Sequence, residues 1–129
     1  MRIQYKLAAV AIAFALVGCN TQPIQNVSQQ AAVNAAGKPL TQDQVRGAIV
    51  RAGGALGWQM ADEGPGKLVG TLNLRKHTAV IEIPYSSSGY SIKYRSSVEL
   101  YEANGQIHKN YNGWIQNLHR GITAQLSAS

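Results

Sequence analysis

Apolar and polar positions repeat with two different periods along residues 41–129, and the order of these periods predicts the fold. Apolar side chains recur at helical spacing over residues 45–56 and again over residues 111–126. Between them, residues 58–95 alternate apolar and polar side chains with the period of two that half-buried strands show. The pattern predicts an α+β domain in the order helix, antiparallel meander, helix.

Both helices have recognisable ends. Residues 41–44, Thr-Gln-Asp-Gln, match a capping box, in which the Thr41 side chain accepts from the first-turn amides and the Gln44 side chain reaches back. Glycine adopts the left-handed conformation found at helix ends, so a glycine-rich stretch predicts the end of the first helix. These glycines are Gly53, Gly54 and Gly57. Asn110 or Asn112 is the predicted cap of the second helix.

The alternating runs predict three to four strands of one sheet. The runs are residues 58–61, 67–75, 78–85 and 90–95. A sheet with both helices packed on a single face buries all the apolar stripes, so a two-layer sandwich is expected. Residues 98–101 either extend this sheet or begin a loop. The polar face is predicted to carry Thr71, Asn73, Arg75, Glu82, Lys93 and Arg95.

The N-terminus has the features of an export signal. Arg2 and Lys6 precede an unbroken apolar run from Leu7 to Val17, which is typical of a secretory signal peptide. The run is about half the length of the roughly 20 apolar residues that a membrane-spanning helix needs. We therefore expect residues 1–18 to be a signal peptide and leave them out of the fold.

The end of this segment, Leu16-Val17-Gly18-Cys19, resembles the lipobox of bacterial lipoprotein precursors. The resemblance implies that Cys19, the only cysteine, receives a diacylglycerol thioether, that cleavage falls between Gly18 and Cys19, and that the new amino group receives an acyl chain such as palmitate. It also implies that Cys19 is neither a nucleophile nor part of a disulfide. Asn20 after the cysteine implies the outer membrane, with the domain facing the periplasm.

The residues after Cys19 look like a linker. Residues 20–39 are rich in Gln, Asn and Ala and almost free of charge, so residues 19–40 are expected to form a lipidated flexible tether that reaches roughly 25 Å. The alternative prediction is that residues 27–36 within this segment form a weak helix. Residues 41–129 are then the single folded domain. Its stretch Ile107–Leu118 resembles small uncharacterised proteobacterial lipoproteins, which implies a common domain and no activity.

The net charge of the chain limits the kinds of partner that it is expected to bind. The net charge of the 129-residue chain is +6, and without Arg2 and Lys6 ten basic and six acidic side chains remain, which gives +4. A moderate positive charge favours anionic surfaces such as lipid headgroups. The sequence has no dense block of Lys and Arg, so no nucleic-acid partner is expected.

The polar residues do not suggest catalytic or metal chemistry. A zinc site needs three or four converging ligands, and His77, His108 and His119 are far apart in the sequence. Residues 86–88, Ser-Ser-Ser, lack the flanking pattern of a nucleophile elbow. The adjacent Asp62 and Glu63 would point to opposite faces of a strand. We therefore expect no enzyme, no metal and no cofactor.

Aromatic and basic residues gather in the second half of the chain. The candidate binding residues are Tyr85, Tyr90, Tyr94, Lys93 and Arg95. Together such side chains stack on sugars or form the centre of a protein interface. The alternative is that the tyrosines fill the space between sheet and helices, and exposure on the open face of the sheet would distinguish the two.

These features lead to a functional hypothesis. The chain is expected to be a non-catalytic lipoprotein of the bacterial envelope that binds another envelope protein through its sheet face or an exposed strand edge. One alternative is a module that binds glycan or peptidoglycan. A second is an inhibitor of an exogenous enzyme, with residues 86–89 inserted into the target's cleft.

Overall fold

The computed structural model describes residues 20–129. The predicted signal peptide and Cys19 lie outside the described residues. The elements, in chain order, are β1 (Thr21–Pro23), β2 (Val27–Ala31), α2 (Gln42–Ala55), β3 (Gln59–Asp62), β4 (Lys67–Leu74), β5 (His77–Pro84), β6 (Gly89–Val98), β7 (Gln106–His108) and α3 (Lys109–Ser127). The predicted α+β class and the order of helix, meander and helix are confirmed.

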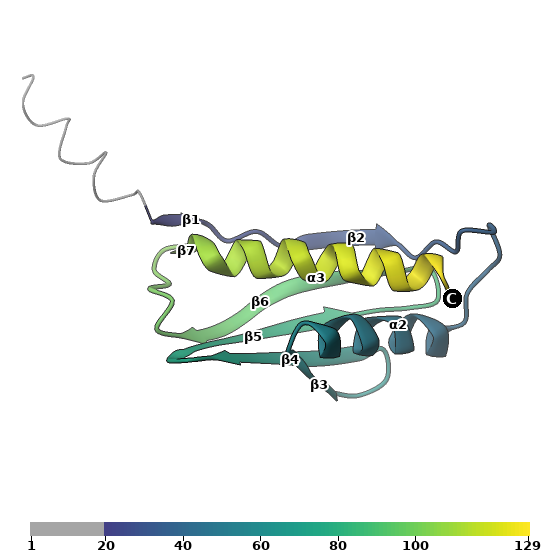
Figure 1. Ribbon diagram of the computed structural model, residues 1–129, viewed down its shortest axis with the longest axis horizontal. Helices are drawn as coiled ribbons and strands as arrows, with labels where there is room; N and C mark the ends of the chain where they lie inside the picture. The colour runs from purple at the N-terminus through teal and green to yellow at the C-terminus, as the bar shows by residue number, and fades with distance from the viewer. Residues whose placement is uncertain (1–19) are drawn as a thin grey trace, which may run out of the picture.

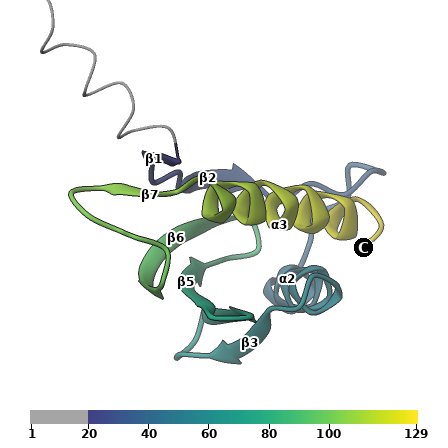
Figure 2. The same cartoon turned by 60° about the vertical axis from the view of Figure 1, so that its left-hand side comes forward.

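The main sheet has five antiparallel strands in the order β2-β6-β5-β4-β3, and β1 pairs with β7 in a separate ribbon. Strands β3 to β6 form the predicted meander, each paired with its neighbour in the chain. Both helices lie on one side of the sheet, and the other side of β3 to β6 is uncovered (Figures 1 and 2). Val98 extends β6, and residues 99–102 form a loop.

Alternation along the strands builds the core as predicted. The inward residues of β4 and β5 are Leu68, Leu72, Ala79, Ile81 and Ile83, and all are buried. They meet apolar residues of the helices, which are Val45, Ala48, Ile49 and Ala52 from α2 and Tyr111, Ile115, Leu118, Ile122 and Leu126 from α3. These side chains fill the space between sheet and helices. The burial of apolar surface, rather than the local propensity for helix or strand, therefore holds the two layers together.

Helix α2 begins at the predicted capping box. The backbone amide of Gln44 donates to Thr41 Oγ1 at 3.1 Å, and the backbone amide of Thr41 donates to Gln44 Oε1 at 2.8 Å. The helix continues through Gly53, which is buried, to Ala55 and ends before Gly57. Gly57 has a φ of +91°, a conformation that glycine adopts without strain.

The predicted cap of α3 is wrong. The N-cap is His108, whose Nδ1 accepts from the backbone amide of Asn110 at 3.2 Å. Asn112 lies inside the helix and is buried, where its Oδ1 accepts from the backbone amide of Gln25 at 3.0 Å. Its Nδ2 donates to the carbonyl of Pro23 at 3.0 Å. Asn112 therefore holds the N-terminal segment against α3 instead of capping the helix.

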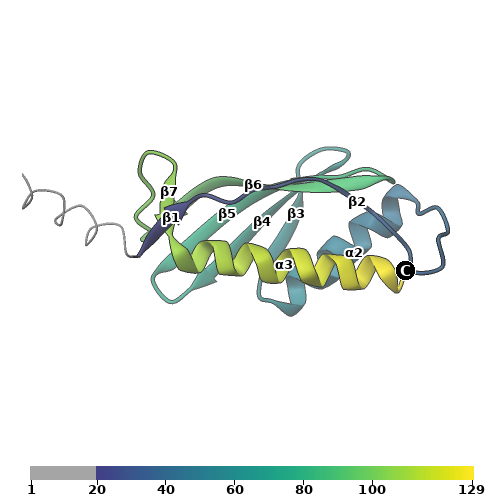
Figure 3. The ribbon, with the colours of Figure 1, turned by 90° about the horizontal axis from the view of Figure 1, so that it is seen from above.

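The predicted tether is also wrong, because residues 21–31 are part of the fold. Strand β2 pairs with β6 at the edge of the main sheet, and β1 pairs with β7; residues 27–36 do not form the alternative helix. Ile24 and Val27 are half-buried against the core. The segment has little apolar content, so its strands depend on backbone bonds to partners that lie far away in the sequence. The folded unit therefore includes β1 and β2, which precede residue 41 (Figure 3).

Tyr111 provides a test of the core. Its side chain is fully buried, and its hydroxyl has no hydrogen-bond partner among residues 20–129. Burial raises the pKa of Tyr111. Because an unsatisfied buried hydroxyl costs about 1–3 kcal/mol, we expect Tyr111→Phe to raise the free energy of unfolding by about 1 kcal/mol in a urea titration.

The matched control is Tyr90→Phe. The Tyr90 hydroxyl lies 2.7 Å from His119 Nδ1, so its removal breaks a hydrogen bond and leaves the imidazole without that partner. We expect this variant to be less stable than the wild type. A loss of stability in Tyr111→Phe would show that the Tyr111 hydroxyl is satisfied.

Candidate binding face

The side of the meander that faces away from both helices has no covering element among residues 20–129. We call this surface the open face, and define it by the outward residues of β3 to β6. The polar residues that alternation placed there are exposed or half-buried: Thr71, Asn73, Arg75, Glu82, Lys93 and Arg95. This is the expected arrangement of an antiparallel sheet that packs one face and leaves the other in water.

Strand register orders the open face into two different halves. In one half, Val69 lies opposite Glu82, and Glu82 lies opposite Lys93. In the other half, Val80 lies between Thr71 and Ser96. The first half is therefore charged, while the second consists of small neutral and β-branched side chains.

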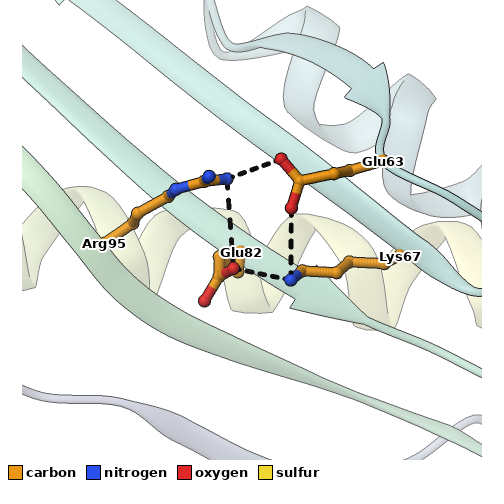
Figure 4. Close-up of polar contacts among 4 residues, drawn as sticks. All are labelled: Glu63, Lys67, Glu82 and Arg95. Carbon is orange, nitrogen blue, oxygen red and sulfur yellow. Dashed lines mark hydrogen bonds and ion pairs between the residues drawn. The ribbon is translucent and has the colours of Figure 1, made fainter.

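Four charged side chains from four consecutive segments form a closed network on the charged half (Figure 4). Arg95 Nη1 lies 2.8 Å from Glu63 Oε2 and 3.9 Å from Glu82 Oε1. Lys67 Nζ lies 2.7 Å from Glu82 Oε1 and 3.2 Å from Glu63 Oε1. Two cations and two anions alternate around this ring, so each charge has two partners of opposite sign.

The network shifts the titration of its members. The hydrogen bond from Arg95 lowers the pKa of Glu63, and the hydrogen bond from Lys67 lowers the pKa of Glu82. In return, Glu82 raises the pKa of Lys67. All four groups are ionised at neutral pH, and the side chains are held in fixed positions on a surface that water still reaches.

These shifts have a sign that can be measured. Because both carboxyl pKa values are lower in the folded chain, the stabilisation is fully present above about pH 4.3, the ordinary value for Glu, and is lost as the pH falls through the lowered values. We expect Glu82→Gln to lower the melting temperature slightly at pH 7, since exposed ion pairs contribute little. The difference from wild type should shrink as the pH falls below about 4.3 and through the lowered pKa values, and it should also shrink in about 1 M salt.

The control for this series is Glu102→Gln, which removes an exposed acid outside the network. Its effect on the melting temperature should not follow the network's pH dependence. A Glu82→Gln difference that does not shrink as the pH falls below about 4.3 would show that the ion pairs do not contribute.

The structure does not bring the five predicted binding residues together. Tyr90 is buried, and the Tyr94 hydroxyl lies 2.8 Å from Ser97 Oγ, while its ring meets Tyr111 edge-on at 5.6 Å. Tyr85 is half-buried and bridges to Tyr90. The tyrosines thus face the helices.

Lys93 is exposed on the opposite side of β6, where Arg95 is held by the network. Successive side chains of a strand point to opposite faces, so the tyrosines and the basic residues of residues 90–95 are separated by the sheet itself. These side chains form no common platform on which a sugar ring would stack.

The three histidines lie at separate places. His77 Nδ1 donates to the carbonyl of Glu99 at 2.8 Å, His108 caps α3, and His119 lies beside Tyr90. Within residues 20–129 there is no group of three or more His, Cys, Asp or Glu side chains that would hold a metal ion.

The remaining polar motifs are parts of turns and edges. Asp62 is bound by Arg46 of α2, with Nη2 at 2.7 Å from Oδ2, so it points away from the partners of Glu63. Ser86 Oγ lies 3.1 Å from Ser88 Oγ in the β5–β6 hairpin loop. This loop and β2 border an open pocket of about 480 Å³.

Comparison with family models, curated proteins and solved structures finds no significant match to this chain. Among the helices of residues 20–129, none combines the length and apolar content that crossing a bilayer requires.

Sequence analysis missed two members of the charged network. Lys67 precedes the inward Leu68 in an alternating run, so its place on the open face was available from the same pattern. Glu63 lies in the turn between β3 and β4, where no period applies, and only the folded turn shows that it reaches Lys67 and Arg95.

Proposed function

We propose that this chain is a non-catalytic lipoprotein of the bacterial envelope that binds another envelope protein through the open face. The observation that carries this proposal is the uncovered, partly charged side of a sheet whose other side is packed by both helices. The lipobox-like segment Leu16–Cys19 supports attachment to a membrane, and Asn20 supports the outer membrane and its periplasmic side.

The charged half of the open face is suited to recognition. Binding usually costs conformational entropy when long side chains become fixed. Lys67 and Arg95 are already held by Glu63 and Glu82. Part of this side-chain entropy is therefore already lost in the free protein, before a partner binds. A partner whose charges complement this ring would be fixed in orientation and register.

The open face is a better candidate than either sheet edge. Strand β3 has only four residues, and its last residue, Asp62, is tied to Arg46. Strand β2 has a shift of register between Val27 and Gln30, and Gln29 has a φ of +49°. Short, charged or bulged edges resist the addition of a further strand.

The test is recovery of the partner from the native host after crosslinking, with mass spectrometry of what copurifies. Ser96→Arg places a large cation on the neutral half of the open face, where Ser96 is exposed and opposite Val80. The matched control, Ala124→Arg, makes the same addition on the exposed side of α3.

We expect one envelope protein to copurify with wild type and with Ala124→Arg and to be lost with Ser96→Arg. Melting temperatures of the three proteins would show that all are folded. Equal recovery with both variants would overturn the open face as the binding surface.

A further inference from the structure

The residue that the proposed function attaches to lipid immediately precedes, in the sequence, the part of the chain that the structure describes. Asn20 is the single residue between Cys19 and β1, and its carbonyl accepts from the backbone amide of Lys109 at 3.0 Å. Thr21 is then paired with His108. A chain advances at most about 3.6 Å per residue, so the Cα of Thr21 lies within about 7 Å of the Cα of Cys19.

Because the connection between the lipidated cysteine and β1 is so short, the domain cannot move far from the bilayer. The polar headgroup region of one leaflet is about 5–8 Å thick, and an acylated cysteine has its chains in the hydrocarbon below it. The β1–β7 end of the molecule must therefore lie at the surface of the headgroups. Helix α3 starts at this end and runs away from it (Figures 1 and 3).

Three segments share the end at which β1 begins. The carbonyl of Leu100 accepts from the backbone amide of His108 in β7 at 2.9 Å, which joins residues 99–105 to the β1–β7 ribbon. His77, at the β4–β5 turn, donates to Glu99 in the same loop. The end surface is thus formed by the β1–β7 ribbon, residues 74–77 and residues 98–105.

This end surface displays apolar side chains. Of the five large apolar residues that are exposed within residues 20–129, three belong to it: Leu74, Val98 and Tyr101, with exposed fractions of 46%, 57% and 61%. The other two lie elsewhere, Val33 before α2 and Leu56 at its C-terminus. Leu74 and Val98 come from opposite sides of the sheet at this end, since Val98 is paired with Thr78 and Thr78 with Asn73, the neighbour of Leu74. The three apolar side chains therefore surround the end of the sheet.

The loop that exposes Tyr101 has an unusual backbone conformation. Glu99 and Tyr101 have φ values of +60° and +57°, which is uncommon for residues other than glycine. Leu100 between them is buried at 1% exposure. The two left-handed residues thus turn Leu100 into the core and Tyr101 into solvent, and strain of this kind is frequent at functional sites.

The charges of the end surface are balanced: the cations are Arg75 and Lys76, and the acids are Glu99 and Glu102. Lys109, the first residue of α3, adds a third cation beside this surface, where its backbone amide donates to the carbonyl of Asn20. Tyrosine, aliphatic side chains and basic residues together are the set that favours the boundary between headgroups and hydrocarbon.

Resting on the proposed attachment of lipid to Cys19, we infer that this end is a membrane-docking surface, and that the domain stands on the lipid bilayer with Leu74, Val98 and Tyr101 at the headgroups. Strand β5 has eight residues at roughly 3.3 Å each, so the hairpin loop at its far end lies roughly 25 Å from the bilayer. The open face then stands along the membrane normal and is accessible to a partner from the side.

The test uses the full protein purified from native membranes and placed in vesicles of phosphatidylethanolamine and phosphatidylglycerol. Glu102→Cys and Ser87→Cys, both at exposed positions, carry a nitroxide label at the two ends of the sheet. Collisions with a water-soluble nickel complex and with oxygen report the depth of each label. We expect a several-fold loss of nickel accessibility at position 102 on transfer into vesicles and none at position 87.

Two double variants distinguish docking of the end surface on the bilayer from mere proximity to the bilayer. Val98→Ser with Tyr101→Ser should restore nickel accessibility at position 102, whereas the matched pair Val33→Ser with Leu56→Ser should not. Unchanged protection in the first pair, or equal accessibility at positions 102 and 87, would overturn the docking surface. An intact mass without acyl chains on Cys19 would instead overturn the proposed lipid attachment, and the docking with it.

Discussion

A chain that begins at residue 33 is expected to be less stable than one that begins at residue 20 by on the order of 4 kcal/mol. The deletion removes β1 and β2, exposes the apolar surface that Ile24 and Val27 cover, and leaves the buried Asn112 without its partners. Since whole domains are stable by about 5–15 kcal/mol, this loss is large. Urea unfolding followed by circular dichroism would measure it on both chains without lipid.

A point substitution checks the same segment without changing chain length. A Cβ at Gly89 would lie 2.6 Å from the backbone carbonyl oxygen of Gln30 in β2, so Gly89→Ala should cost about 1–3 kcal/mol. The control is Gly54→Ala in α2, where nothing lies within 4 Å of the new Cβ and the helix gains propensity, so stability should not fall. Equal stability of the long and short chains, with a neutral Gly89→Ala, would show that residues 20–32 are a tether after all.

The second large effect concerns the membrane. Changing Leu16→Ala, Gly18→Ala and Cys19→Ala together turns the lipobox-like segment into an A-x-A-like site for ordinary secretory cleavage. We expect wild type to sediment with membranes and the triple variant to be released into the soluble periplasmic fraction. The reason is that two or three acyl chains anchor a protein stably, whereas the secreted variant would carry none.

The folded domain is its own control in this experiment. Residues 20–129 are unchanged, so both proteins should unfold at the same temperature once they are removed from membranes. A triple variant that is cleaved yet still sediments with membranes, or a wild type that is soluble, would contradict lipid attachment at Cys19.

The meander could be predicted because each of its strands pairs with its neighbour in the chain, and the alternating side chains that define it lie within the strand itself. Each strand between residues 67 and 95 has enough alternating side chains to show which face is inward, and the short turns leave only one simple way to pair neighbours. The same alternation predicted that Tyr90, Tyr94, Lys93 and Arg95 could not all share one face. The candidate cluster required them to do so, and the folded strand separates them.

The N-terminal strands were not predictable for the opposite reason. Residues 21–31 carry few apolar side chains, and their strands are stabilised by backbone bonds to β6 and β7, about 60 or more residues away. Asn112 was expected at a helix cap because its type favours caps. Its burial against Gln25 and Pro23 depends on a segment that the local pattern did not place in the fold.

The most direct measurement is to capture whatever touches the open face of the anchored protein in its native host. A photoreactive amino acid would replace Thr71 on the open face or, as the control, Ala124 on α3. We predict that one envelope protein is joined to position 71, not to position 124, and that the product is lost in the secreted triple variant. No product above background at position 71, or the same products at both positions, would contradict a lipid-anchored protein that binds through its open face.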